Sequence, residues 1–175
     1  MRRQSGFTLI ELLVALATLA IVVGLGAPGL RDFMMNNRQV AAVNEMVASI
    51  ALSRSEAVAR NLTVSICPSA NGTSCAIGDW DQGWIVFSDN DGDGTFDAGV
   101  DTVIKAIEET AALTVTTPDL GTSVTYRPNG RVRAQGQLVF CDARGSDEAR
   151  VVQLDIVGRP VVSKTLRGGG TPSCG

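Results

Sequence analysis

The stretch from Phe7 to Ala27 constrains this chain more than any other, because it runs for 21 residues with one charged side chain, Glu11. As an α-helix it is long enough to cross the ~30 Å hydrocarbon core of a bilayer. The residues before it, MRRQSG, include Arg2 and Arg3, and positive charge beside a spanning helix holds that end in the cytoplasm. We therefore expect a single span, with the rest of the chain on the far side of the membrane.

Two simpler interpretations of this stretch fit less well. A cleaved signal peptide has an apolar core of about 7–15 residues followed by small residues, whereas this run is longer and the small residue Gly6 precedes it. A plain membrane anchor explains the length but not Glu11. A carboxylate about one turn into an apolar helix is costly in lipid and indicates a functional residue with a partner.

The residues G-F-T-L-I-E at 6–11 resemble the prepilin signature of type IV pilins and type II secretion pseudopilins. The resemblance implies that a prepilin peptidase cleaves between Gly6 and Phe7 and that Phe7 is then N-methylated. It also implies that Glu11 pairs with the new terminal amine of a neighbouring subunit during assembly. A carboxylate in a low-dielectric filament core needs a well-placed charged partner, which agrees with that role.

The charge is unevenly spread along the chain. Removing Arg2 and Arg3 with the leader changes the formal net charge from −3 to −5, which argues against bulk, non-specific nucleic-acid binding. Residues 61–119 are acidic, with Lys105 as their one basic residue, whereas residues 126–175 are rich in arginine. This asymmetry indicates a partner surface. With no histidine in the chain and no phosphate-binding glycine loop, we expect a structural or binding protein and not an enzyme.

The four cysteines lie beyond the predicted membrane span, where disulfides persist. Three pairings are possible. Cys67 and Cys75 flank the turn-forming loop PSANGTS, and a bridge from Cys141 to Cys174 would hold a C-terminal tail that otherwise frays. We predict Cys67–Cys75 and Cys141–Cys174. A zinc site is the alternative, although the cysteine spacings do not suit one.

Helical periodicity continues beyond the membrane. Apolar residues recur at helical spacing at Val40, Val43, Val47, Ile50 and Ala57. We expect an amphipathic helix to about Arg60 that stops at Asn61, with Pro28 and its neighbouring glycines able to kink or locally melt it.

After Asn61 the sequence becomes rich in β-branched residues, in short runs separated by Gly, Pro, Asn and Asp. This pattern predicts an antiparallel sheet. The expected strands are Leu62–Cys67, Trp84–Ser88, Thr102–Glu108, Leu113–Thr117, Val124–Arg127, Leu138–Cys141, Val151–Ile156 and Val161–Lys164. The predicted fold class is α+β: a long N-terminal helix, half of it transmembrane, packed on an antiparallel β-sheet domain.

Several motifs in the soluble part resemble the GspH/FimT family, which holds the FimT and FimU minor pilins of type IV pili and the GspH minor pseudopilin of type II secretion. They are LSRSEAVARN at 52–61, WDQGWIVFSD at 80–89, YRPNG at 126–130 and LVFCD at 138–142. The resemblance implies one long helix from Phe7 to near Arg60. The expected organisation is a prepilin leader at 1–6, a helix at 7–60 with its transmembrane half at 7–29, and a β-rich domain at 61–175.

The resemblance implies a minor pilin of a type IV pilus that helps prime assembly and is incorporated at or near the tip. Its partners would be other minor pilins and the major pilin, through the N-terminal helix, together with prepilin peptidase and the inner membrane. The soluble domain would be periplasmic and then displayed on the cell surface. The alternatives are a DNA-binding pilin for natural transformation and a GspH-like minor pseudopilin of type II secretion.

The segment DNDGDGTFD at 89–97 resembles the first nine positions of an EF-hand calcium loop. Carboxylates stand at relative positions 1, 3, 5 and 9, with glycine at 6; they are Asp89, Asp91, Asp93 and Asp97. Val100 replaces the bidentate glutamate at position 12, and Asp101 follows one residue late. Because four carboxylates in nine residues repel one another without a cation, calcium is the candidate cofactor. The alternative is an ordinary Asp/Gly-rich turn.

A second candidate site lies in the basic C-terminal third. In FimT-type pilins used for natural transformation, a Gly-Arg-x-Arg element in the C-terminal region is linked to DNA binding. Gly130-Arg131-Val132-Arg133 has this spelling, whereas Gly158-Arg159-Pro160-Val161, which best matches the family's position, lacks the second arginine. The candidate nucleic-acid residues are Arg131, Arg133 and Arg159, with salt-dependent phosphate contacts. The alternative is a solvated strand face with a hairpin glycine.

Overall fold

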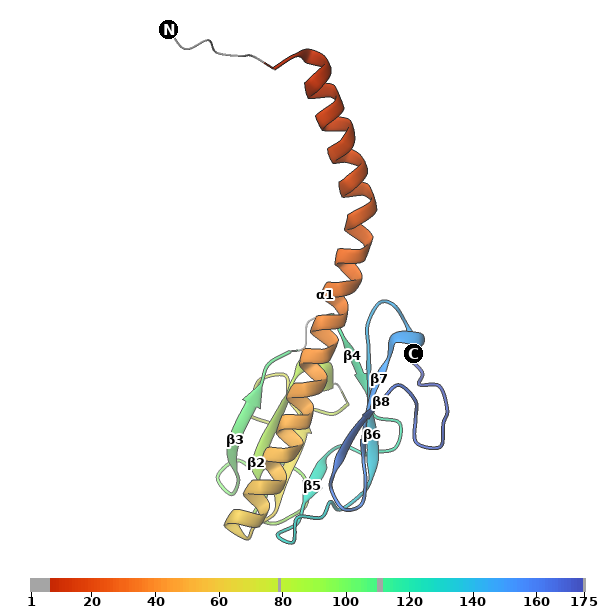
Figure 1. Ribbon diagram of the computed structural model, residues 1–175. Helices are drawn as coiled ribbons and strands as arrows, with labels where there is room; N and C mark the ends of the chain where they lie inside the picture. Colours follow the sequence, from red (N-terminus) through yellow and green to blue (C-terminus); the bar gives the residue numbers. More distant parts are fainter. Residues whose placement is uncertain (1–6, 79, 110–111, 175) are drawn as a thin grey trace. The chain divides into compact units, whose positions relative to one another are not determined.

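The computed structural model describes residues 7–78, 80–109 and 112–174, without the side chains of residues 25–28. Two compact units, Met1–Asn37 and Arg38–Gly175, divide the chain, and each is described by itself. Helix α1 runs from Leu9 to Arg60 through both (Figure 1). In the described part of the chain it is the one helix long and apolar enough to cross a membrane, with a mean hydropathy of 2.5 over 18 residues.

Helix α1 keeps its helical backbone at Pro28, so the helix does not melt there. A proline inside a helix removes its own backbone donor and its ring crowds the carbonyl four residues earlier, but the hydrogen bonds of the adjoining turns remain available. The C-terminal end matches the expected stop. Asn61 has a φ of 55°, and the backbone N–H of Leu62 donates to the carbonyl of Ala57 at 3.2 Å, which together form a left-handed helix cap.

Eight strands, counted over the described residues, form two antiparallel four-stranded sheets (Figure 1). The first contains β3 (Thr102–Ile107), β2 (Trp84–Ser88), β1 (Val64–Pro68) and β5 (Val124–Tyr126), in that order. The second contains β4 (Thr114–Thr116), β6 (Gly136–Cys141), β7 (Arg150–Leu154) and β8 (Pro160–Ser163), in that order. Short 3₁₀ helices, η1 (Trp80–Gln82) and η2 (Ser146–Glu148), precede β2 and β7. All eight expected strands are present, and the α+β prediction is confirmed.

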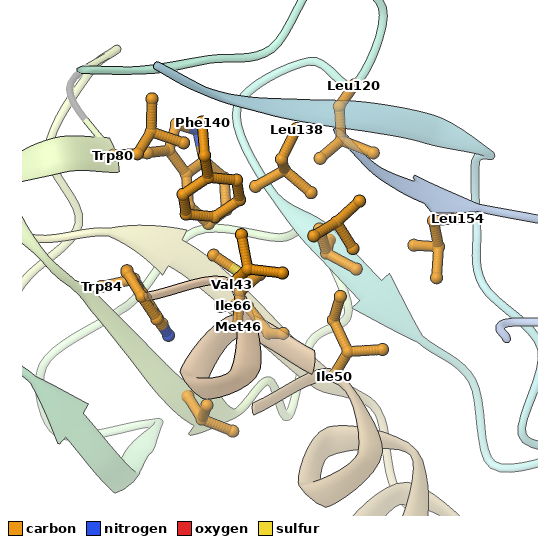
Figure 2. Packing of buried hydrophobic residues seen from close by; sticks show 14 of the residues in the cluster. Val43, Met46, Ile50, Ile66, Trp80, Trp84, Leu120, Leu138, Phe140 and Leu154 are labelled. Atoms are coloured by element: carbon orange, nitrogen blue, oxygen red, sulfur yellow. The ribbon is translucent and has the colours of Figure 1, made fainter. Parts of the chain in front are cut away.

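The core lies where the C-terminal half of α1 meets both sheets. Val43, Met46 and Ile50 on α1 are buried in one hydrophobic cluster with Ile66 on β1 and Phe140 on β6 (Figure 2). The predicted apolar stripe is right at Val43, Ile50 and Ala57. Val40 and Val47 are only half-buried, and Ala42 and Met46 take the central positions.

Polar side chains on the buried face of α1 attach it to both sheets. Gln39 donates its Nε2 to the carbonyls of Phe140 and Glu148, both at 3.0 Å. Ser49 accepts a hydrogen bond from the indole Nε1 of Trp84 at 3.0 Å. Because Trp84 is on β2 and Phe140 is on β6, the helix is fixed to each sheet by buried hydrogen bonds as well as by apolar contact.

Two disulfides join Cys67 to Cys75 and Cys141 to Cys174, the pairs expected from the sequence. The first closes the loop that follows β1. The second ties the C-terminal tail to the end of β6, where both cysteines pack in a small apolar cluster with Leu166.

Candidate functional site

Glu11 lies in the first turn of α1, and among the described residues its hydrogen bonds are to Thr8. Its Oε2 accepts the backbone N–H of Thr8 at 3.5 Å, and the Thr8 hydroxyl accepts the backbone N–H of Glu11 at 3.3 Å. This reciprocal pair is a capping box, which satisfies two N–H groups at the helix start. Among the described residues no cationic side chain forms an ion pair with Glu11, so its carboxylate has capacity for a partner outside the chain.

Apolar side chains surround Glu11 and are exposed within the chain. Phe7 is 87% exposed, and Gly6, on the other side of the expected cleavage point, lies outside the described residues. Further exposed apolar side chains along the same segment are Leu9, Ile10, Leu12, Leu13, Val14, Leu16, Leu19, Ile21, Val22 and Val23. An apolar surface of this extent requires lipid or other helices to cover it.

The acidic loop, residues 89–101, connects β2 to β3. Asp89 follows β2 directly and is 0% exposed. Its Oδ2 accepts hydrogen bonds from the Ser65 hydroxyl at 2.6 Å and from the backbone N–H of Gly94 at 3.0 Å. Its Oδ1 is shielded from solvent and has no hydrogen-bond donor in the described part of the chain.

Gly94 allows the loop to fold back onto Asp89. It has a φ of +90°, in the left-handed region that favours glycine, and a methyl group there would lie 2.6 Å from the Ser123 hydroxyl. Phe96 adds an apolar anchor, because its ring meets Phe87 on β2 edge to face with centroids 5.5 Å apart. The loop backbone is thus held against the first sheet.

The loop gathers five carboxylates in two groups. Asp89, Asp91 and Asp101 form one, and Asp91, Asp93 and Asp97 form the other; in each, the carboxylate oxygens lie within 4.8 Å of one another. The sequence-based set is therefore brought together, with Asp101 added to it. Val100, the residue at position 12, is 54% exposed and supplies no carboxylate.

The environment of the loop disfavours negative charge. Burial raises the pKa of Asp89 above its ordinary value, against the lowering effect of the Ser65 hydrogen bond. Desolvation and then the carboxylates of Asp93 and Asp91 raise the pKa of Asp97. None of the described lysines and arginines forms an ion pair with these five aspartates.

The three candidate nucleic-acid arginines have different surroundings. The Arg133 guanidinium donates to the backbone carbonyls of Gly92 and Asp93 in the acidic loop. Arg159 forms an exposed ion pair with Asp155, 3.6 Å from Nε to Oδ2. Arg131 is exposed.

The structure brings the two Gly-Arg turns together, which sequence reasoning did not foresee. The Tyr126 hydroxyl donates to the Gly158 carbonyl at 2.8 Å, and burial raises the pKa of Tyr126 well above its ordinary value. A methyl group at Gly158 would lie 3.1 Å from the Gly130 carbonyl oxygen, and one at Gly130 would lie 3.4 Å from Arg54 Nε. The turns that lead to Arg131 and Arg159 are therefore neighbours beside α1.

Sequence comparisons give two family matches. The profile of the family described as type II transport protein GspH matches residues 42–158. The profile of the prokaryotic N-terminal methylation motif matches residues 1–27. A comparison with curated proteins finds no match.

Three solved structures resemble the chain. Two are crystal structures of the type IV minor pilin FimU of Pseudomonas aeruginosa, both 21% identical. One has a TM-score of 0.60 and covers 81% of this chain and 98% of FimU; the other has a TM-score of 0.56 and covers 77% and 98%. The third is the minor pseudopilin EpsH of the Vibrio cholerae type 2 secretion system, with a TM-score of 0.45, 10% identity and coverage of 71% and 94%. The FimU comparison shows that the fold is shared.

Proposed function

Because this chain belongs to the GspH family of minor pilins and pseudopilins, we propose that it is a minor pilin of a type IV pilus, which helps prime assembly and enters the filament at or near the tip. The observation that carries the proposal is the start of α1. There a carboxylate with no cationic partner among the described residues is surrounded by exposed apolar side chains. Helix-to-helix packing in a filament would bury such a surface, whereas the isolated chain leaves it exposed.

The proposed life cycle follows from the N-terminal motif. Residues 1–6 are a leader that prepilin peptidase removes before Phe7, and the new amino terminus is methylated; the methylation-motif match over residues 1–27 supports this. The leader end faces the cytoplasm and the β-rich domain faces the periplasm, where its two disulfides are stable.

The proposed partners are other minor pilins and the major pilin, bound through the N-terminal segment of α1. In each contact the Glu11 carboxylate pairs with the terminal amine of a neighbouring subunit. The chain acts as a structural subunit and not as an enzyme.

The test is where the protein is found when filaments are sheared from cells. We expect the mature chain in the sheared fraction at a level far below that of the major pilin, and we expect deletion of its gene to reduce surface pili. Exclusive recovery in the cell envelope, with lost protein secretion and normal pili on deletion, would instead identify a type II secretion pseudopilin.

A second candidate, DNA binding at the pilus tip, is favoured by the meeting of the Gly130 and Gly158 turns beside Arg54. The test is an electrophoretic mobility shift with the full chain in detergent at two salt concentrations. Affinity that falls steeply with salt and is reduced in Arg131→Gln/Arg159→Gln, but not in the control Lys105→Gln, would support this function. Equal affinity in all three proteins would exclude these arginines as the DNA contacts.

A further inference from the structure

We propose that the acidic loop, residues 89–101, is a calcium site whose ligands are the carboxylates of Asp89, Asp91, Asp93, Asp97 and Asp101. This is independent of the role in filament assembly, because all five ligands belong to the β-rich domain. The proposal rests on the ligand geometry and on the buried oxygen of Asp89.

Asp89 provides the strongest indication that a cation binds here. Its Oδ2 is fully used by Ser65 and Gly94, whereas Oδ1 has neither solvent nor a donor in the described part of the chain. A buried carboxylate oxygen left without a partner is strongly unfavourable. A cation bound to Oδ1 removes this penalty and uses a carboxylate that two hydrogen bonds already hold in place.

Within each of the two groups, the spacing of the carboxylates fits one hard cation. Calcium binds oxygen ligands at about 2.3–2.6 Å, so two ligands of one ion lie at most about 5 Å apart. The oxygens of Asp89, Asp91 and Asp101 lie within 4.8 Å of one another, as do those of Asp91, Asp93 and Asp97. Asp91 belongs to both groups and therefore links them.

Asp101 takes over the role expected of the residue at position 12. Its Oδ1 accepts the backbone N–H of Asn90 at 2.9 Å, and its Oδ2 accepts the backbone N–H of Asp97 at 3.0 Å. The bond to Asn90 fastens the end of the loop to its beginning, and the Asp101 carboxylate lies beside Asp89 and Asp91. A shift of one residue thus restores an acidic ligand that Val100 cannot supply.

Contacts outside the carboxylates also hold the loop in place. Phe96 packs on Phe87, and Arg133 holds the carbonyls of Gly92 and Asp93. Arg133 contacts backbone oxygens and not the carboxylates, so these stay available. The flexible coordination number of calcium suits such an irregular set, whereas magnesium demands octahedral geometry and retains its water.

The test is a calorimetric titration of the full chain in detergent with calcium chloride, after treatment with a chelator, combined with thermal melts. We expect half-saturation at about 10⁻⁴–10⁻³ M. At a tenfold excess over the Kd, the melting temperature should rise by about 3–6 °C. Magnesium chloride at the same concentration should give a much smaller rise.

The variant Asp91→Asn/Asp93→Asn should lose the heat and the shift. Asparagine keeps the Oδ1 acceptors that Asp91 and Asp93 offer to the backbone N–H groups of Asp93 and Thr95, so the loop should keep its fold. The matched control, Glu108→Gln/Asp147→Asn, removes two exposed charges elsewhere and should respond like the unaltered chain. No heat and no shift at millimolar calcium, an equal response to magnesium, or an equal loss in the control would each overturn the proposal.

Discussion

The indole N–H of Trp84 on β2 donates a hydrogen bond to the hydroxyl of Ser49 on α1, 3.0 Å away, and both residues are fully buried. Ser53, one turn further along, donates its own hydroxyl to the Ser49 carbonyl at 2.8 Å. The hydroxyls of Ser49 and Ser53, which interrupt the apolar stripe of α1, therefore have hydrogen-bond partners inside the core. The Ser49–Trp84 bond fixes the rotation of α1 on the first sheet.

Replacing Ser49 with alanine should destabilise the fold, because it leaves the buried Trp84 N–H without an acceptor. We expect a loss of about 1–3 kcal/mol, measured as a lower melting temperature of the full chain in detergent. Ser55→Ala, at an exposed position on the same helix, should change stability by less than about 0.5 kcal/mol. Equal losses of stability in the two variants would show that the hydrogen bond to Trp84 does not stabilise the fold.

The two disulfides should differ in their contribution to stability. Cys141 and Cys174 are separated by 33 residues, and Cys67 and Cys75 by 8. In the chain-entropy account, a bridge closing the longer loop stabilises by about 4 kcal/mol and one closing the shorter loop by about 2.5 kcal/mol. Cys141→Ser/Cys174→Ser should therefore lower the melting temperature more than Cys67→Ser/Cys75→Ser. The reverse order would indicate that the tail beyond β8 adds little to the fold.

Much of the fold could be predicted from local sequence signals. The helix stop at Asn61 and all eight strands follow from turn residues and β-branched runs. The division into two sheets could not be predicted in this way, because the pairing of β1 with β5 and of β4 with β6 depends on contacts between distant segments. The burial of Gln39 and Ser49 also depends on partners far along the chain, so periodicity placed the apolar stripe slightly off its true centre.

The candidate sites were predictable in part. Their spacing in the sequence identifies four of the carboxylates, those of Asp89, Asp91, Asp93 and Asp97. The position of Asp101 beside them depends on its hydrogen bonds to Asn90 and Asp97. The capping box follows a sequence pattern, Thr8-x-x-Glu11, so it is predictable from local sequence alone. The engagement of Arg133 with the acidic loop joins segments some 40 residues apart, and no sequence signal reports it.

Asp142 should make stability depend on pH in acid. Its side chain is 2% exposed and pairs with Arg144, 2.6 Å from Oδ2 to Nη2, and these hydrogen bonds hold the pKa of Asp142 below its ordinary value. A folded pKa below the unfolded one gives stabilisation that is present above about pH 4 and is lost as the pH falls through the folded value.

The variant Asp142→Asn imitates the protonated side chain. We expect it to be less stable than the unaltered chain at pH 7, by about 1–3 kcal/mol, and nearly equal to it at about pH 2. Thermal melts at both pH values provide the measurement. Asp147→Asn, at an exposed position, serves as the control and should show little difference at either pH. A deficit in Asp142→Asn that is as large in acid as at neutrality would mean that the charge of Asp142 does not stabilise the fold.

Glu11 combines a capping role inside the chain with a proposed pairing role between chains, and two substitutions separate them. Glutamine at this position keeps the capping hydrogen bond to Thr8 but carries no negative charge, whereas valine removes both. If pairing with a neighbouring terminal amine drives assembly, Glu11→Gln and Glu11→Val should both insert into the membrane normally and both be absent from sheared filaments. Thr8→Ala removes the other half of the capping box, at a cost of about 0.5–2 kcal/mol to the helix start, and keeps the charge, so it should still assemble. Immunoblots of the membrane and sheared fractions give the measurement, and normal assembly of Glu11→Gln would show that Glu11 serves the helix cap alone.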